Sequence, residues 1–400
     1  MKVYKFIELF SESLWAKAIR RGLIFLIPLI IAGSLALIIN NLPLAAYQQF
    51  MNRLFGENWK IAGALIDNLS FGIIGLALTG TVCFTAIEEY NHKYGTRIHP
   101  YIVSLAAIIS FLLLTNRGIE GLMSKQVGNN AIFLAIIIAV ITTELFVRLQ
   151  LLSSKRFERD MIDSDPAISR SLSALIPFLV SISLFTGLKL MLSAMGIEDL
   201  NDVLSQNLEK LFLNINSPLA SLLLYLFLTQ LFWFFGIHGS KLLFSVNNNI
   251  YLEASKVNAL IHAAGEIPEN IVTKSFLDAF AIIGGSGATI ALILAIFISR
   301  QKGTTREIAK YSLLPSVFNI NELIVFGLPI VLNPFFFIPF ITVPIILALS
   351  AYLASVAGFL PVTTADVIWT TPPLLSGYLA TGSVRGTLMQ VFNIALGTLF

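Results

Sequence analysis

The sequence has few charged residues and a single cysteine. Only 12% of its 400 residues are Asp, Glu, Lys or Arg, against about 25% in ordinary soluble domains, so an ordinary soluble domain is excluded. Cys83 has no second cysteine in the chain with which to form a disulfide, and its apolar surroundings favour a small buried side chain over a reactive thiol. The net charge of +3 is small and spread over the loops, which argues against a nucleic-acid partner.

Motifs for metal or nucleotide chemistry are also missing. The sequence contains no HExxH, no paired-cysteine motif and no nucleotide-binding motif, so we expect no metal, no other cofactor and no ATP hydrolysis. The segment GGSGAT, residues 284–289, lacks the Gly-Lys-Ser/Thr ending of a phosphate loop. Its small residues either allow helices to pack closely or leave room for a ligand that contacts Gly284, Gly285 and Ser286.

Long apolar runs, by contrast, are abundant. The chain is 56% hydrophobic and its mean hydropathy is +0.81, which predicts an all-α polytopic membrane protein with about ten transmembrane helices and re-entrant hairpins. Residues 2–19 have the apolar spacing of an N-terminal helix lying in the membrane interface. The predicted spans are Leu23–Leu42, Ala62–Ile87, His99–Leu114, Ala131–Leu152, Ser169–Met191, Ser217–Ile237, Phe276–Ser299, Phe337–Ala357 and a last span from Leu374.

The character of the chain changes near residue 200. Residues 1–200 read as plain helices suited to packing and oligomerisation, whereas residues 201–400 are interrupted, rich in Gly and Pro, and polar at depth. We therefore expect an N-terminal dimerisation half and a C-terminal binding and translocation half. Lys17, Arg20 and Arg21 precede the first span, which predicts a cytoplasmic N-terminus by the positive-inside rule.

The stretch from Pro315 to Phe340 places Asn319, Asn321 and Glu322 among apolar residues and interrupts them with four prolines. An ionisable group at membrane depth costs about 2.5 kcal/mol or more, so it is normally paired, hydrated or used for function. Broken backbone survives at that depth only where it packs in protein or lines a water-filled site. We interpret the stretch as the floor of a polar-ligand site. The alternative for Glu322 is a buried carboxylate held by the asparagines or a histidine.

Three aromatic or histidine side chains are further candidates. His238 lies between Gly236 and Gly239 at the end of a span, where the glycines let the backbone approach a ligand, and Trp233 five residues earlier offers a face for sugar stacking. The alternative is a histidine satisfied by a neighbouring carbonyl. Trp369 precedes two prolines, and taken alone it would be an interfacial anchor.

Four sequence blocks carry a resemblance to a known family: WFFGIHG at 233–239, IIGGSGATIAL at 282–292, FNINELIVFGLPIVLNPFFFIPF at 318–340 and WTTPPLLSGYLATGSVRG at 369–386. In content and order they resemble the lactose/cellobiose/diacetylchitobiose family of membrane-spanning IIC components of the phosphoenolpyruvate-dependent sugar phosphotransferase system. The likeness covers essentially the whole chain. Leu323 is a departure, because the family usually has proline after the glutamate.

The resemblance implies a homodimer in a bacterial-type cytoplasmic (inner) membrane, joined by the N-terminal helices. It implies that His238, Glu322 and Trp369 contact the sugar, with Glu322 accepting a hydrogen bond from the sugar 6-hydroxyl or acting as its base. It further implies alternating access, and phosphorylation of the sugar by a phosphocysteine on a separate IIB protein, which is served by IIA. This chain would carry no phosphorylated residue. From the residues themselves, and not from the resemblance, we expect Trp233, Asn319 and Asn321 to complete the sugar site.

Two other functions remain open from the sequence. One is a sugar-sensing membrane module in a longer protein with a cytoplasmic signalling domain after residue 400, since Phe400 lies within an apolar run. The other is an ion-coupled secondary transporter, whose uptake would depend on the membrane gradient and not on phosphoenolpyruvate.

Overall fold

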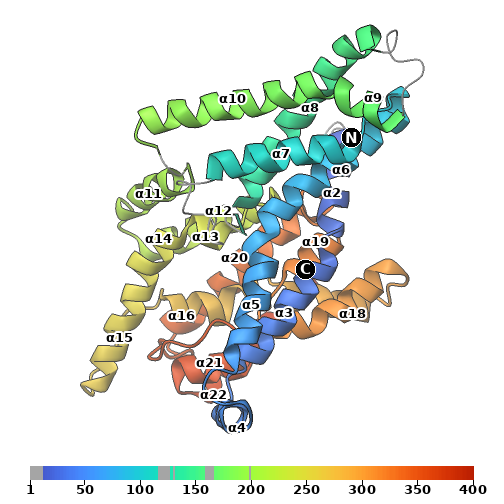
Figure 1. Ribbon diagram of the computed structural model, residues 1–400. Coiled ribbons are helices and arrows are strands. Elements are labelled where there is room, and N and C mark those ends of the chain that lie inside the picture. Colours follow the sequence, from blue (N-terminus) through green and yellow to red (C-terminus); the bar gives the residue numbers. More distant parts are fainter. Residues whose placement is uncertain (1–11, 116–126, 129–130, 158–165, 198–199) are drawn as a thin grey trace, which may run out of the picture. The chain divides into compact units, whose positions relative to one another are not determined.

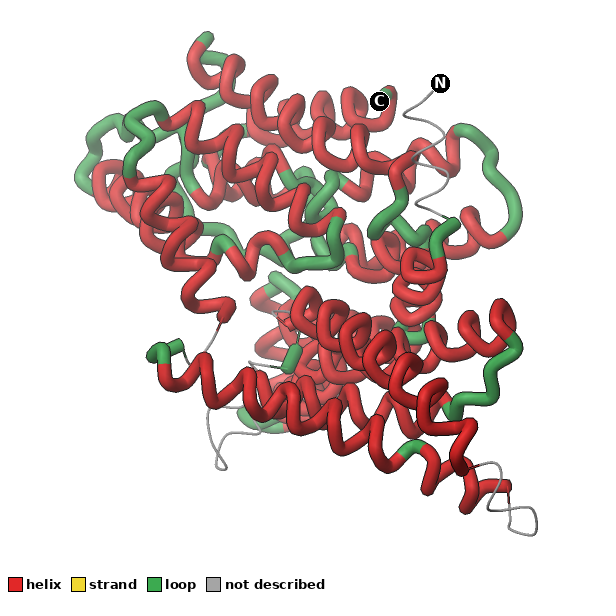
Figure 2. Tube along the Cα trace, turned by 90° about the horizontal axis from the view of Figure 1, so that it is seen from above, coloured by secondary structure: helices red, strands yellow, loops and turns green. Residues whose placement is uncertain are grey.

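The computed structural model describes residues 12–115, 127–128, 131–157, 166–197 and 200–400 (Figure 1). These residues form helices and connecting loops, and no strand occurs among them (Figure 2). The predicted all-α class is confirmed. Most of the predicted interfacial helix at residues 2–19 lies outside the described residues, and the first described helix, α2, begins at Leu14.

The chain forms two compact units. The first comprises Met1–Leu29 and Leu69–Val203, and the second comprises Ile30–Asn68 and Leu204–Phe400. The boundary at Val203 lies close to the predicted division near residue 200, but Ile30–Asn68 packs with the second unit. The division of roles between the two halves stays a prediction.

The first unit is built around α6 (Ile74–Tyr94), which packs against α2, α7 and α8. The close approach of α2 and α6 depends on Gly22, because a Cβ there would lie 2.8 Å from a methyl carbon of Val82. Thr85 ties the same two helices by donating to the carbonyl of Ala18 at 2.8 Å. The other elements of this unit are α2 (Leu14–Ile24), the 3₁₀ turn η1 (Phe71–Ile73), α7 (Pro100–Thr115), α8 (Ile132–Phe157), α9 (Pro166–Ser173) and α10 (Leu175–Ala194).

Cys83 lies in the middle of α6 and is fully buried. Its sulfur accepts a hydrogen bond from the Thr143 hydroxyl at 3.2 Å and donates to the carbonyl of Ala139 at 3.4 Å. The prediction of a small buried side chain is confirmed.

The second unit contains the interrupted helices. Its hydrophobic core joins α12, the π-helices η3 and η4, α20 and the last two helices. Its elements are α3 (Ile27–Asn41), α4 (Ala45–Phe55), α5 (Lys60–Ser70), α11 (Leu200–Leu213), α12 (Pro218–Phe234), α13 (Gly239–Leu242), α14 (Phe244–Val246), η3 (Asn247–Leu252), α15 (Glu253–Ala263), α16 (Lys274–Phe276), η4 (Leu277–Ala281), α17 (Thr289–Ile298), α18 (Thr304–Val317), α19 (Glu322–Gly327), α20 (Pro334–Val356), α21 (Leu375–Thr381) and α22 (Val384–Leu399).

Four helices among the described residues are long and apolar enough to cross a membrane, and a fifth is gained if the bent pair Leu14–Ile24 and Ile27–Asn41 counts as one span. The predicted span Phe276–Ser299 is not continuous: α16 and η4 end at Ala281, a turn follows, and α17 begins at Thr289. Gly284 and Gly285 cause the break, because their φ angles of +83° and +95° do not belong to a helix. The four long helices are Lys60–Tyr94, Ile132–Leu152, Ile168–Ala194 and Pro334–Val356.

Candidate functional site

Asn319 ends helix α18 in the left-handed conformation, with a φ of 61°. The Ile320 N–H donates to the carbonyl of Pro315 and the Asn319 N–H to that of Ser316, both at 3.0 Å. This pair of hydrogen bonds is the Schellman motif, in which glycine is usual and asparagine is tolerated. The sequence therefore stops α18 at this point and turns the chain into α19, which begins at Glu322.

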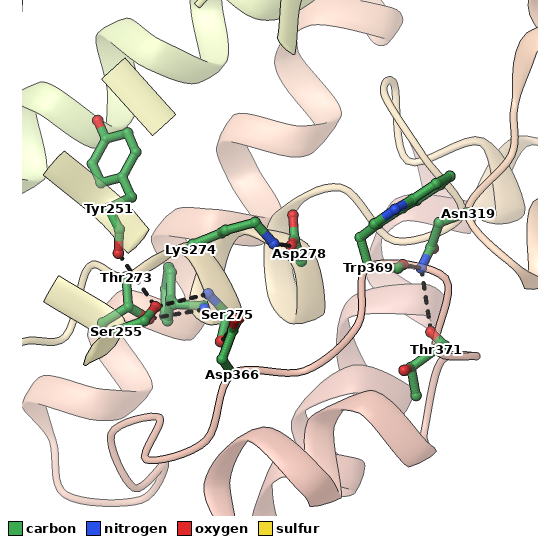
Figure 3. Close-up of polar contacts among 11 residues, drawn as sticks. Tyr251, Ser255, Thr273, Lys274, Ser275, Asp278, Asn319, Asp366, Trp369 and Thr371 are labelled. Atoms are coloured by element: carbon green, nitrogen blue, oxygen red, sulfur yellow. Dashed lines mark hydrogen bonds and ion pairs between the residues drawn. The ribbon is translucent and has the colours of Figure 1, made fainter. Parts of the chain in front are cut away.

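The side chain of Asn319 joins three segments that are far apart in the sequence. Its Oδ1 accepts a hydrogen bond from the Gly284 N–H at 2.8 Å. Its Nδ2 donates to the carbonyl of Trp369 at 2.6 Å and to that of Thr371 at 3.2 Å, as Figure 3 shows. One amide thus connects GGSGAT, the Pro315–Phe340 stretch and the loop that carries Trp369.

Asn321 makes a second connection between the first two of these segments. Its Nδ2 donates to the carbonyl of Ser286 at 2.7 Å. Gly285 lies directly against it, because a Cβ on Gly285 would be 2.7 Å from Asn321 Cγ. Gly285 is therefore packed closely against the Pro315–Phe340 stretch, and a ligand contact by Gly284, Gly285 and Ser286 stays a prediction.

Replacing Gly285 with alanine should destabilise the protein by about 2 kcal/mol. The new methyl group would overlap Asn321, and overpacking of this kind costs about 1 to 3 kcal/mol. Its φ of +95° adds strain for any residue with a Cβ. The matched control is Gly303→Ala, since Gly303 has a φ of +67° with nothing within 4 Å of its Cβ position. Thermal unfolding in detergent would compare the two, and equal midpoints would show that the contact with Asn321 is unimportant.

Glu322 is the first residue of α19, and its exposed fraction is only 8%. The remaining residues of this six-residue helix are buried as well. The carboxyl group is therefore located inside the second unit, on a short helix between two interruptions of the backbone. This is the setting in which an ionisable group indicates function or a specific partner.

His238 and α19 are connected through a row of rings. The ring centroids of His238 and Trp233 are 4.5 Å apart, and those of Trp233 and Phe326 are 6.2 Å apart. Phe326 lies one helical turn after Glu322 on α19. Trp233 is 1% exposed, so its indole is enclosed by protein. The buried His238 Nδ1 has no hydrogen-bond partner within the described residues.

Trp369 is 46% exposed and lies in the loop between α20 and α21. Asparagine side chains donate hydrogen bonds to main-chain carbonyls near both ends of this loop. Asn319 binds it at Trp369 and Thr371, and Asn258 Nδ2 donates to the carbonyl of Thr363 at 3.0 Å. The half-exposed indole therefore projects from a loop with a defined path.

The structure places all nine predicted site residues in the second unit. Gly284, Gly285, Ser286, Asn319, Asn321 and Trp369 form one connected assembly, to which Glu322 is adjacent in sequence. His238 and Trp233 reach the same helix, α19, through Phe326. The amide groups of both asparagines are occupied by backbone groups.

Several polar residues near this assembly carry no sequence motif, and sequence reasoning missed them. Lys274 and Asp278 form an ion pair of 2.6 Å, and the Ser275 hydroxyl donates to Asp366 at 3.5 Å (Figure 3). The spacing of Lys274 and Asp278, four residues apart in an apolar segment, was a usable signal. Gln390 of α22, which binds the main chain around the site, gave none.

These features define a polytopic helical membrane protein whose polar groups lie on interrupted helices of one unit. The chain belongs to the phosphotransferase system EIIC family, with a match over residues 20–344. It is 34% identical over 397 residues to the lichenan permease IIC component of Bacillus subtilis (strain 168), covering 95% of this chain and 86% of that protein.

Two further comparisons agree with this assignment. The cellobiose-specific EIIC component of Geobacillus stearothermophilus is 30% identical over 403 residues, covering 96% of this chain and 87% of that protein. The crystal structure of ChbC, the IIC component of the N,N'-diacetylchitobiose-specific phosphotransferase system, matches with a TM-score of 0.54 and 30% identity, covering 99% of this chain and 94% of that one. The chain is therefore a membrane-embedded component of the phosphotransferase system.

Proposed function

We propose that this chain binds a β-linked disaccharide, such as cellobiose, diacetylchitobiose or lactose, and moves it inward by alternating access. It then presents the sugar 6-hydroxyl to a phosphocysteine on a separate IIB protein, which receives its phosphoryl group through IIA. The names of the relatives, which refer to lichenan, cellobiose and diacetylchitobiose, support a β-linked substrate. The chain itself carries no phosphorylated residue and contributes binding and orientation.

The observation that carries this proposal is the position of Glu322. Its carboxyl group is buried on a short helix, and the half-exposed Trp369 is tied to the preceding turn through Asn319. An aromatic face and a few polar groups in a concave site are the usual means of orienting a small polar ligand. Trp369 stacks on the sugar, and His238 and Glu322 bind its hydroxyl groups.

The chemistry assigned to Glu322 is a hydrogen bond to the sugar 6-hydroxyl that assists its deprotonation. When IIB arrives, the bond between phosphorus and the cysteine sulfur breaks and a bond to the sugar O6 forms. The hydroxyl proton passes to the Glu322 carboxylate, which is general-base catalysis. The thiolate leaves with IIB.

The proposal extends to assembly and orientation. We infer a homodimer joined by the first unit in the bacterial inner membrane, with a cytoplasmic N-terminus beside Lys17, Arg20 and Arg21. Helix α10 supports this because many of its apolar side chains are exposed, among them Leu179 and Leu184. Either the lipid or a second copy covers such a face, and sedimentation equilibrium in detergent distinguishes a dimer from a monomer.

Replacing Glu322 with glutamine should weaken disaccharide binding by about 10- to 100-fold, because a hydrogen bond to a charged group contributes about 1.5 to 3 kcal/mol. Purified protein would be titrated calorimetrically with cellobiose, lactose, diacetylchitobiose and glucose. Glu307→Gln, at an exposed position of α18, is the matched control and should leave the affinity unchanged. Unaltered binding and uptake in Glu322→Gln would contradict the proposed role.

Uptake measurements separate this proposal from the other functions. Transport by the phosphotransferase system requires phosphoenolpyruvate and delivers a phosphorylated sugar. An ion-coupled transporter would instead lose uptake when the membrane gradient is abolished, and a sensing module would bind sugar without phosphorylation.

A further inference from the structure

We propose that Asn319 is a positioning residue: it holds the Trp369 indole in position for the sugar, and the Asn319 amide itself does not bind the sugar. This inference rests on the proposed function, and it revises the expectation from the sequence that Asn319 contacts the sugar. Asn319 looks like a sugar contact in the sequence, because it precedes Glu322 in a polar block at membrane depth. Its contacts in the structure point to a different role.

The hydrogen-bonding capacity of the Asn319 amide is almost fully used. An asparagine NH₂ group has two donors, and these donate to the carbonyls of Trp369 and Thr371. The Oδ1 atom accepts from the Gly284 N–H. No donor remains for a sugar hydroxyl, so a direct contact would have to break a hydrogen bond that holds the Trp369 loop.

The backbone of Asn319 explains why an asparagine occupies this position. Glycine is the usual residue at the left-handed position of a Schellman motif, and it would relieve the strain at a φ of 61°. Glycine has no amide, however. Asparagine is the residue that tolerates the left-handed conformation and also reaches the two carbonyls of the Trp369 loop.

The hydrogen bonds of Asn319 hold the backbone of Trp369, whose side chain is half-exposed. Asn319 binds the carbonyl of Trp369 itself and that of Thr371, while Asn258 holds the loop at Thr363. An aromatic face binds a sugar best when it is already in place, because ordering a loop on binding lowers the affinity. Asn319 orders the loop at Trp369 itself, whereas Asn258 orders it at Thr363, six residues earlier.

Asn321 provides a matched control within the same block. It is the same residue type, two positions away, and its Nδ2 also binds a backbone carbonyl, that of Ser286. Its partner lies in GGSGAT and not in the Trp369 loop. Loss of the Asn321 amide should therefore act on the site independently of Trp369.

The test is a double-mutant cycle on the full-length protein in detergent, with the dissociation constant for cellobiose measured by calorimetry. Asn319→Gly keeps the left-handed backbone and removes only the amide. Trp369→Leu should weaken binding by about 30-fold and Asn319→Gly by about 10-fold. The double variant should bind no more weakly than Trp369→Leu alone, because Asn319 acts through the indole. In the parallel cycle, the losses from Asn321→Ala and Trp369→Leu should multiply.

Multiplying losses for Asn319→Gly and Trp369→Leu would overturn the inference and leave the proposed function intact. Unchanged binding in Asn319→Gly would do the same. Unchanged binding in Trp369→Leu would remove both the sugar contact and the role of Asn319, whereas Glu322→Gln tests the proposed function separately.

A second measurement keeps the inference testable if Asn319→Gly lowers the affinity by destabilising the whole protein. Tryptophan fluorescence quenching by acrylamide would be measured for each protein and for the same protein carrying Trp369→Leu. The difference between the two is the quenching of Trp369. This quenching should increase in Asn319→Gly and stay constant in Asn321→Ala. Equal quenching in both variants would contradict a positioning role.

Discussion

Replacing Gln390 with leucine is expected to leave little folded protein. Gln390 is 1% exposed on α22, and its amide makes four hydrogen bonds. The Nε2 atom donates to the carbonyl of Ala279 at 2.7 Å and to the Ser376 hydroxyl at 2.8 Å. The Oε1 atom accepts from the N–H groups of Leu374 and Gly377, at 2.7 and 2.8 Å.

The partners of Gln390 are groups that interrupted helices leave unsatisfied. The carbonyl of Ala279 lies in π-helix η4, just before the turn that ends it, and the Leu374 and Gly377 N–H groups lie at the start of α21. Leucine would leave all three without a partner at about 1 to 3 kcal/mol each, and no water in the bilayer core can replace it. The sum, about 3 to 9 kcal/mol, is comparable to a typical free energy of unfolding of about 5 to 15 kcal/mol.

The measurement is the yield of monodisperse protein in size-exclusion chromatography, followed by thermal unfolding of what remains. Gln301→Leu, the same substitution at an exposed glutamine in the loop before α18, is the control and should give the wild-type yield. Similar unfolding midpoints for the two variants would mean that the main chain satisfies itself without Gln390.

The sequence predicted the interrupted stretch and its polar residues well, because charge and amide groups stand out among apolar neighbours. Glu322 and Asn319 were predicted as site residues from that contrast. The partners of Asn319 were not predictable: Gly284 is 35 residues away and Trp369 is 50 residues away, and no local pattern encodes such a pairing. The role of an asparagine at membrane depth depends on which carbonyls it reaches.

The continuous span predicted for Phe276–Ser299 shows what apolar composition alone does not predict. Apolar composition predicts a span wherever about 20 such residues follow one another, and it does not distinguish an unbroken helix from two short pieces. Gly284, Gly285 and Gly287, all at positive φ, break the helix here. Gln390 and Asn393, whose side chains bind the carbonyls of Ala279 and Phe280 before that break, look like isolated polar residues in an apolar helix until their partners are known.

Replacing Gly239 with alanine is the second substitution with a large expected effect. Gly239 begins α13 directly after His238, and it touches the backbone of α12. A Cβ there would overlap the carbonyl oxygen of Thr229 and would lie 2.7 Å from the Thr229 Cα, against about 3.5 to 4.0 Å for comfortable contact between carbon atoms. No side-chain rotation relieves an overlap with main chain, so α12 and α13 must separate.

We expect Gly239→Ala to destabilise the protein by about 3 kcal/mol, at the upper end of overpacking effects, and to weaken sugar binding further than the loss of stability explains. The second effect follows because Trp233 belongs to α12 and His238 immediately precedes α13, so separation of the two helices pulls apart rings whose centroids are 4.5 Å apart. Thermal unfolding measures the first effect, and calorimetric titration with cellobiose well below the unfolding midpoint measures the second.

The control for this substitution is Gly187→Ala, inside α10, where nothing lies within 4 Å of the Cβ position. Alanine there should raise stability slightly, since glycine in a helix interior costs about 0.5 to 1 kcal/mol relative to alanine. A Gly239→Ala protein that is less stable yet binds cellobiose with wild-type affinity would separate the packing of α12 and α13 from the site. His238 would then not depend on the close approach that Gly239 permits.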